Sequence, residues 1–252
     1  MIYKVEEKIK IKYNSFHKEM KTNFDFDVVL YNKNKDERCY LVNRKNVINI
    51  PEIDNNFVKL LSELEEINYP LKVKTNTKRV FIDIEDFDNW LKEWKIKASK
   101  ISEKYNNEEN IKDIVDNYYQ IIKNKDIFIK NKFKEPFWNL FFYDFNSKSF
   151  DWHVNTIGSM NFQGQNKSLK TDPGKETWKF ESFQQLSEPI IEKLKQTTTT
   201  EKTDWDNQKA ELTVEFYVDF IEQSTRLKKA FFSLTIDNVI SYDEETTIKQ
   251  MD

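Results

Sequence analysis

Residues 2–13 read IYKVEEKIKIKY and residues 23–30 read NFDFDVVL, and in both stretches apolar side chains alternate with charged or polar ones. A period of two is typical of a β-strand that buries one face. We therefore expect two antiparallel strands joined by a hairpin connection over residues 14–21. The inward positions of these strands are Tyr3, Val5, Ile9, Ile11 and Tyr13, followed by Phe24, Phe26, Val28 and Leu30.

The strand pattern extends to residue 50 and then gives way to helical spacing. Apolar residues that recur every three or four positions predict an amphipathic helix with one buried face. The expected strands of this region are 38–43, 47–50, 71–75 and 80–84, and the expected helices are 53–67, 87–105 and 108–123.

A similar order of elements returns after the last of these helices. Its strands are expected over 137–145, 150–156, 178–183, 210–220 and 230–236, with a short helix over 188–196. We therefore predict an α+β protein with a mostly antiparallel sheet covered by amphipathic helices. A β-rich half over residues 1–85 and a second β-rich half over residues 136–252, which is a candidate structural repeat of the first, flank a helical segment over residues 86–135. The three parts can pack as one domain.

Glycine is scarce in this chain. Its 252 residues hold three glycines, where average usage predicts roughly 18. Neither a P-loop nor a Rossmann glycine motif can be built from three glycines at these positions, and the G-x-S-x-G motif of serine hydrolases is absent. The sequence therefore identifies no enzymatic active site, and we expect no cofactor.

Cysteine and histidine give no sign of a metal site. The single cysteine, Cys39, excludes an intramolecular disulfide and a multi-cysteine metal site, and we expect it to be buried. His17 falls in the predicted hairpin connection and His153 in a predicted strand, without the spacing that zinc ligands need. We therefore expect no bound metal.

Four carboxylates lie close together at Asp83, Glu85, Asp86 and Asp88. Such a group at a strand end can converge on Mg²⁺ or Ca²⁺. Asp86 and Asp88, however, fall at the start of a predicted helix, where free N–H groups and the helix dipole stabilise carboxylates. We therefore expect Asp86 at the cap of this helix and Asp88 in its first turn.

The charge pattern does not favour a nucleic-acid partner. Net charge is −3, and the lysines on the outer face of residues 2–13 lie beside Asp25 and Asp27 of the next strand. No apolar run approaches the roughly 18 residues of a membrane span, and no signal-peptide core is visible near residue 1. We expect a soluble, cytoplasmic protein, with an exported mature domain as the alternative.

Two polar connections are the candidate partner-binding elements. Trp205 lies in the polar stretch TDWDN, where an exposed aromatic side chain often anchors a binding surface; the alternative is a tryptophan folded back onto the core. The long connection over residues 158–175 is expected to be irregular and to contact a partner. Its candidate residues are Gly158, Gly164, Asp172 and Gly174.

Three functions agree with these patterns. The first is a non-enzymatic protein-interaction protein, such as an adaptor, an immunity-type inhibitor or a subunit of a bacterial assembly. The alternative is a carrier or sensor of a hydrophobic small molecule in an aromatic-lined, cupped sheet; a cavity above roughly 300 Å³ would favour it, and a solid core would remove it. An enzyme acting on sugar or protein would need His153, or a carboxylate pair with a perturbed pKa, in a cleft.

Overall fold

The computed structural model describes most of the chain. The described residues are 1–13, 16–51, 56–105, 109–142, 149–154, 160–165, 167–172, 175–185, 188, 191–192, 195, 209–219, 224–236 and 240–251.

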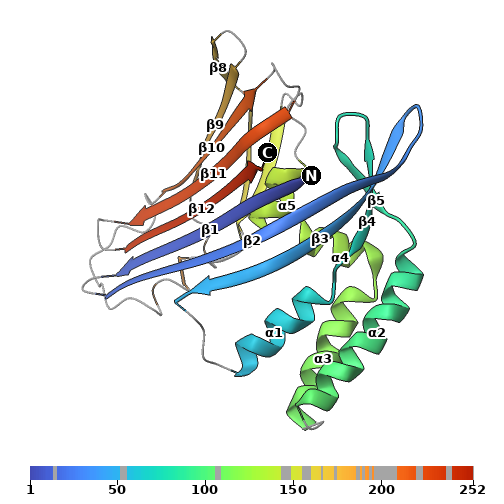
Figure 1. The fold of residues 1–252 in the computed structure, drawn as a ribbon. Coiled ribbons are helices and arrows are strands. Elements are labelled where there is room, and N and C mark those ends of the chain that lie inside the picture. Colours follow the sequence, from blue (N-terminus) through green and yellow to red (C-terminus); the bar gives the residue numbers. More distant parts are fainter. Residues whose placement is uncertain are drawn as a thin grey trace.

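One antiparallel sheet dominates the molecule (Figure 1). Its ten strands run in the order β5-β4-β3-β2-β1-β12-β11-β10-β9-β8, and β6 and β7 form a separate pair. The strands are β1 (Ile2–Tyr13), β2 (Phe16–Lys33), β3 (Glu37–Ile50), β4 (Leu71–Asn76), β5 (Phe81–Ile84), β6 (Ser149–Val154), β7 (Met160–Gln165), β8 (Lys167–Asp172), β9 (Lys175–Gln185), β10 (Lys209–Asp219), β11 (Ser224–Ile236) and β12 (Ile240–Gln250).

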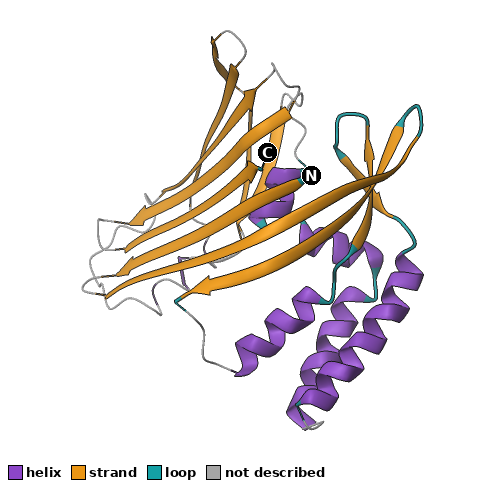
Figure 2. Cartoon of the chain, in the orientation of Figure 1, coloured by secondary structure: helices purple, strands orange, loops and turns teal. Residues whose placement is uncertain are grey.

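Helices cover the inner face of this curved sheet, the face that carries Tyr3, Val5 and Phe26 (Figure 2). A short helix lies directly against the sheet, and four others gather beyond β3. The helices are α1 (Asn56–Glu66), α2 (Phe87–Lys104), α3 (Glu109–Ile122), α4 (Lys125–Lys132) and α5 (Pro136–Phe141). The predicted α+β class, with an antiparallel sheet and covering helices, is confirmed.

The first and last strands are neighbours in the middle of the sheet. β1 pairs with β2 on one side and with β12 on the other, so strands from residues 1–85 and from residues 136–252 form one continuous sheet.

The aromatic side chains of α5 pack against the inner face of β1 and β2. The Phe26 ring lies 4.4 Å from the Phe137 ring and 5.1 Å from the Phe141 ring, and the Tyr3 ring lies 5.0 Å from that of Phe141. Trp138 is completely buried beside them. Edge-to-face contacts of this kind hold the helix on the sheet in one orientation.

The prediction of a strand over residues 137–145 is wrong, because helix α5 occupies the first part of that range. The run PFWNLFF is apolar at nearly every position, so its periodicity does not distinguish a strand from a buried helix. Pro136 at the first helical position supplies the helical φ angle and lacks the N–H that a strand would need to pair.

Other boundaries also differ from the predictions. Residues 16–21 belong to β2 and not to a connection, and they place His17 on an exposed strand. Residues 38–50 form one strand, with the left-handed Asn46 inside it. Two elements were not expected. In β12, threonine, serine and acidic residues dilute the apolar alternation. Helix α4 is only eight residues long.

The expectation of an irregular connection over residues 158–175 is also wrong for its described part. Met160–Gln165 and Lys167–Asp172 are strands that pair with β6 and β9. Both strands pair with strands that are adjacent in sequence, but polar residues and glycine dilute their apolar alternation, so the period of two does not reveal them.

Candidate functional site

The inner face changes character along the central strands. On β1, Tyr3 and Val5 are buried under the helices, and the next inward residue is Glu7. The strand register places Glu7 opposite Thr22 of β2 and Thr246 of β12. Directly opposed residues share a face of the sheet, so polar groups from three neighbouring strands meet on the side that the helices cover.

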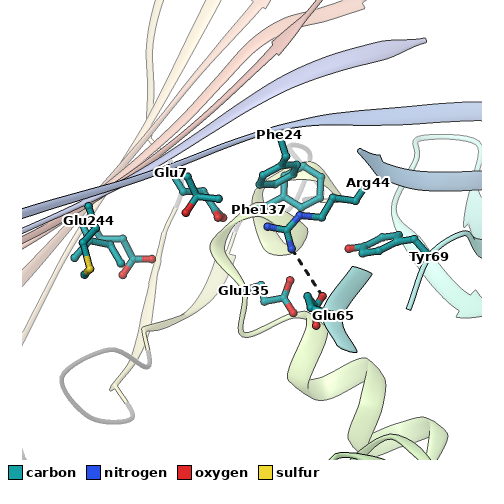
Figure 3. Close-up of a pocket in the computed structure, with 11 residues that line it drawn as sticks. Glu7, Phe24, Arg44, Glu65, Tyr69, Glu135, Phe137 and Glu244 are labelled. Atoms are coloured by element: carbon teal, nitrogen blue, oxygen red, sulfur yellow. Dashed lines mark ion pairs between the residues drawn. The ribbon is translucent and has the colours of Figure 1, made fainter. Parts of the chain in front are cut away.

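A pocket of about 420 Å³ opens at this position, between the sheet and the helices. Carboxylates and an arginine form one part of its wall, and aromatic and aliphatic side chains form the other (Figure 3). The lining residues are Glu7, Ile9, Met20, Thr22, Phe24, Arg44, Glu65, Tyr69, Glu135, Phe137 and Glu244.

A buried lysine forms ion pairs with two of the carboxylates of the pocket. Lys132, the last residue of α4, is 3% exposed, and its ammonium group pairs with Glu65 and, at 3.0 Å, with Glu135. The α4 helix is fixed at its start by Asn124, whose side-chain oxygen accepts the Ile127 N–H at 3.1 Å. Lys132 therefore ties the end of α1 to the start of α5.

Glu65 is the most fully bonded carboxylate of the pocket. Its Oε2 atom accepts hydrogen bonds from the Tyr118 hydroxyl at 2.8 Å and from the Asn68 amide at 2.9 Å. Arg44 Nη1 lies 4.0 Å from its Oε1 atom (Figure 3). Burial raises the pKa of Glu65, but Lys132, Arg44 and Tyr118 outweigh that effect and lower the pKa below its usual range.

Arg44 connects the charged wall to the aromatic wall. Its guanidinium carbon lies 4.2 Å from the centre of the Phe24 ring, a cation–π contact. Its Nε atom is buried and has no hydrogen-bond partner. The side chain is therefore held in place by Phe24 and Glu65 and keeps one donor unused.

Glu7 and Glu135 differ from Glu65 in their titration. Burial raises the pKa of Glu7 from 4.5 to about 7, and the carboxylates of Glu135, Glu244 and Glu65 add to the effect while Arg44 opposes it. Burial also raises the pKa of Glu135 to about 7, against the opposing effect of Lys132. Both groups therefore change charge near neutral pH, which is typical of sites with a chemical role.

The aromatic wall is rigid. The Trp138 indole N–H donates a hydrogen bond to the Tyr69 hydroxyl at 3.0 Å, and burial raises the pKa of that hydroxyl. The Phe137 ring packs 5.2 Å from the Phe24 ring at an angle of 82°. Because these rings are fixed by their neighbours, the pocket is formed before any ligand arrives.

Two of the residues predicted to bind a partner lie in strands. Gly164 lies in β7 opposite Phe150, and Asp172 ends β8 opposite Lys175. Trp205, Gly158 and Gly174 lie outside the described residues.

The other candidate residues have structural surroundings. Cys39 is buried, as expected, and is a free thiol. Asp86 occupies the position before α2 but forms no side-chain cap; it pairs with Lys72 at 3.3 Å instead, so the capping prediction is wrong for its side chain. Asp83 pairs with Lys125 at 2.7 Å, and Glu85 accepts a hydrogen bond from Tyr31.

Metal binding finds no support among the residues that the structure describes. No group of three or more histidine, cysteine, aspartate or glutamate side chains in that part of the chain is arranged to hold a metal ion.

The pocket residues were missed at the sequence level, although two of them carry a signal. Glu7 stands at an inward position between Val5 and Ile9, and Arg44 follows the inward residues Tyr40 and Val42 of β3. A charged residue at a position that the period of two assigns to the core is an exception that points to a site.

Comparisons with known proteins do not assign a family. No family model and no curated protein matches the chain. A solved structure of lipid–protein interactions in lipovitellin matches with a TM-score of 0.42 and 6% sequence identity, over 100% of this chain and 25% of the other. The chain thus spans about a quarter of the length of that protein.

Within the described part of the chain, no helix has the length and apolar character required to cross a membrane.

Proposed function

We propose that this protein binds a small molecule with an apolar body in the pocket beneath the central strands, as a carrier or sensor. The observation that carries the proposal is the preformed cavity of about 420 Å³ beside the fixed rings of Phe24, Tyr69 and Phe137. This volume lies within the range of small-molecule sites, roughly 300–1,000 Å³.

The charged residues of the pocket wall favour a site that binds a ligand over a gap in an apolar core. An uncovered stretch of inner face could be closed by apolar side chains, as α5 closes the neighbouring stretch. Here the facing positions of α1 and of the segment before α5 carry Glu65 and Glu135 instead. Carboxylates retain water and cannot seal against Ile9 and Phe24, so they keep the pocket open.

Titration with N-phenyl-1-naphthylamine, whose fluorescence rises in an apolar environment, tests the proposal. We expect saturable binding to the full chain, and loss of binding in Ile9→Trp, which places a larger ring in the pocket. Leu30→Trp is the matched control, because Leu30 is exposed on β2 and does not line the pocket. Equal binding by both variants would contradict the proposal.

An enzyme that cleaves a glycosidic bond is a second candidate. It is favoured by the two carboxyl groups of Glu65 and Glu135 in one pocket, because most glycosidases use a pair of carboxyl groups. The bonds that already engage Glu65 oppose this role. Release of nitrophenol from p-nitrophenyl glycosides, abolished in Glu135→Gln, would favour the enzyme over the carrier.

The protein-interaction hypothesis and the cytoplasmic location stay predictions. Affinity purification of the tagged chain from its native cells tests the first, and fractionation of the same cells tests the second. A stoichiometric protein partner would support an adaptor, inhibitor or assembly subunit.

A further inference from the structure

We infer that the helices hold a second ligand site, for a small molecule with a carboxylate and a short apolar body. This inference goes beyond the proposed function, because the site is separate from the pocket under the central strands.

The site is a groove of about 560 Å³ between α2 and α3, two helices that lie side by side (Figure 1). We call it the helix groove. Ala98, Ser99 and Ser102 of α2 line it together with Val115 of α3, and these small side chains leave the space open. Its volume lies within the range of small-molecule sites, roughly 300–1,000 Å³.

An unused hydrogen-bond donor belongs to the lining of the helix groove. Trp94 is 1% exposed, and its indole Nε1 atom has no hydrogen-bond partner. The rings of Tyr118 and Tyr119 stack on the indole with interplanar angles of 5° and 25°, so they lie against its faces and not against the edge that carries Nε1. A buried donor without an acceptor destabilises the folded protein, and a ligand oxygen at this edge would relieve that effect.

Two lysines bring positive charge to the helix groove. The Lys95 ammonium group lies 4.2 Å from the centre of the Tyr119 ring, a cation–π contact, and Lys112 lines the groove from α3. Among the residues that the structure describes, neither lysine forms an ion pair with a carboxylate. Asp116 is the acidic residue of the lining, and the two lysines outweigh its single charge.

A carboxylate matches both features of the helix groove. Its oxygens only accept hydrogen bonds, so one of them can take the Trp94 N–H while the lysines provide charge-assisted contacts. An ammonium group would bring a donor to a donor and a cation to two cations. A hydroxyl could accept from Trp94 but would gain no charge-assisted contact as strong. The apolar body would lie against Ala98 and Val115, which are buried.

The indole N–H signal of Trp94 in a proton–nitrogen correlation NMR spectrum tests the inference. The chain has six tryptophans, and the signal of Trp94 is the one that Trp94→Phe removes. On titration of the full chain with hexanoate we expect a saturable downfield shift of this signal. Hexanoate should bind at least roughly tenfold more tightly than hexanol, because its headgroup forms charge-assisted contacts. Hexylamine should leave the signal in place.

Two lysine variants test the charge requirement. Lys95→Met and Lys112→Met should each weaken hexanoate binding at least roughly threefold and leave hexanol binding unchanged. Both side chains are exposed, so the fold should tolerate their replacement. Lys100→Met is the matched control, because Lys100 is an exposed residue of the same helix as Lys95 and does not line the groove. Its hexanoate affinity should equal that of the wild type.

A variant of the other pocket separates the two sites. Ile9→Trp narrows the pocket under the central strands and should leave the Trp94 shift and the hexanoate affinity unchanged. A Trp94 signal that hexanoate does not move, equal affinity for hexanoate and hexanol, or unchanged hexanoate affinity in both lysine variants would overturn the carboxylate site and leave the proposed function standing. Loss of the shift in Ile9→Trp would assign hexanoate to the central pocket and would also overturn the second site.

Discussion

The inner face of the central strands differs between its two ends: α5 covers one end, and the pocket opens at the other. At the covered end, Tyr3 and Phe26 pack against the rings of α5, and Val5 is buried beside them. At the open end, beginning two residues further along β1, Glu7 and Thr22 face a pocket. The alternation that makes a strand is the same at both ends, so it determines which side chains point inward and not what they meet.

The length of α5 explains the difference. A helix of six residues is about 9 Å long, whereas the 12 residues of β1 extend about 40 Å. The helix can therefore cover only a few inward positions of each strand. The remaining positions face the termini of α1 and α4 and the residue before α5, and those positions carry Glu65, Lys132 and Glu135.

The largest effect should come from the covered end. Phe26→Ala removes a completely buried ring that touches four other aromatic rings, and we expect the free energy of unfolding to fall by about 4 kcal/mol. Met20→Ala, a pocket-lining change on the same strand, should cost about 1 kcal/mol. Urea denaturation measures both, and equal losses would remove the distinction between the two ends.

Loss of the buried lysine should come next. Lys132→Met leaves Glu65 and Glu135 without their shared ammonium group, and we expect a loss of about 3 kcal/mol at about pH 8. Because protonation of the carboxylates relieves their repulsion, the loss should be smaller at about pH 5. A loss that is the same at both pH values would show that packing, and not charge, explains the effect.

We expect one substitution in the pocket, Glu7→Gln on β1, to increase the stability of the protein. The folded pKa of Glu7 is about 7 against 4.5 for a free glutamate, so the folded state retains a proton that the unfolded state releases between these values. The free energy of unfolding therefore falls as pH rises through this range. Glu7→Gln should remove the loss and stabilise the protein by roughly 2 kcal/mol at about pH 8, with little effect below pH 4.5.

The smallest effect is expected on the outer face of the same strand. Hydrogen bonds from Lys21 and Lys8 lower the pKa of Glu6, so its contribution to stability is present above the unfolded pKa of 4.5 and is lost as pH falls through the folded value. Glu6→Gln should cost about 0.5 kcal/mol at neutral pH, as expected for an exposed pair. Molar salt should abolish this difference, and stabilisation by Glu6→Gln would contradict the assignment of the two faces.

The fold was predictable where one period dominates the sequence. Alternation located β1 and the part of β2 over residues 23–30, and the stripe containing Trp90 and Trp94 located α2. The run around Trp138 was not predictable, because a segment that is apolar at almost every position satisfies both periods.

The site was less predictable than the fold, because four elements contribute its carboxylates and only the sheet register and helix packing bring them together. Glu65 and Glu135 are ordinary surface residues by local pattern. Glu7 alone among the carboxylates interrupts an apolar alternation that the sequence makes plain.

The pairing of β1 with β12 has a consequence for the order of events during synthesis. β1 and β2 can form a hairpin early, but the other edge of β1 has no partner until residues 240–250 have left the ribosome. A bare edge recruits other strands during that interval. Lys4, Lys8, Lys10 and Lys12 protect it: their charges discourage intermolecular pairing until the last strand arrives and completes the sheet.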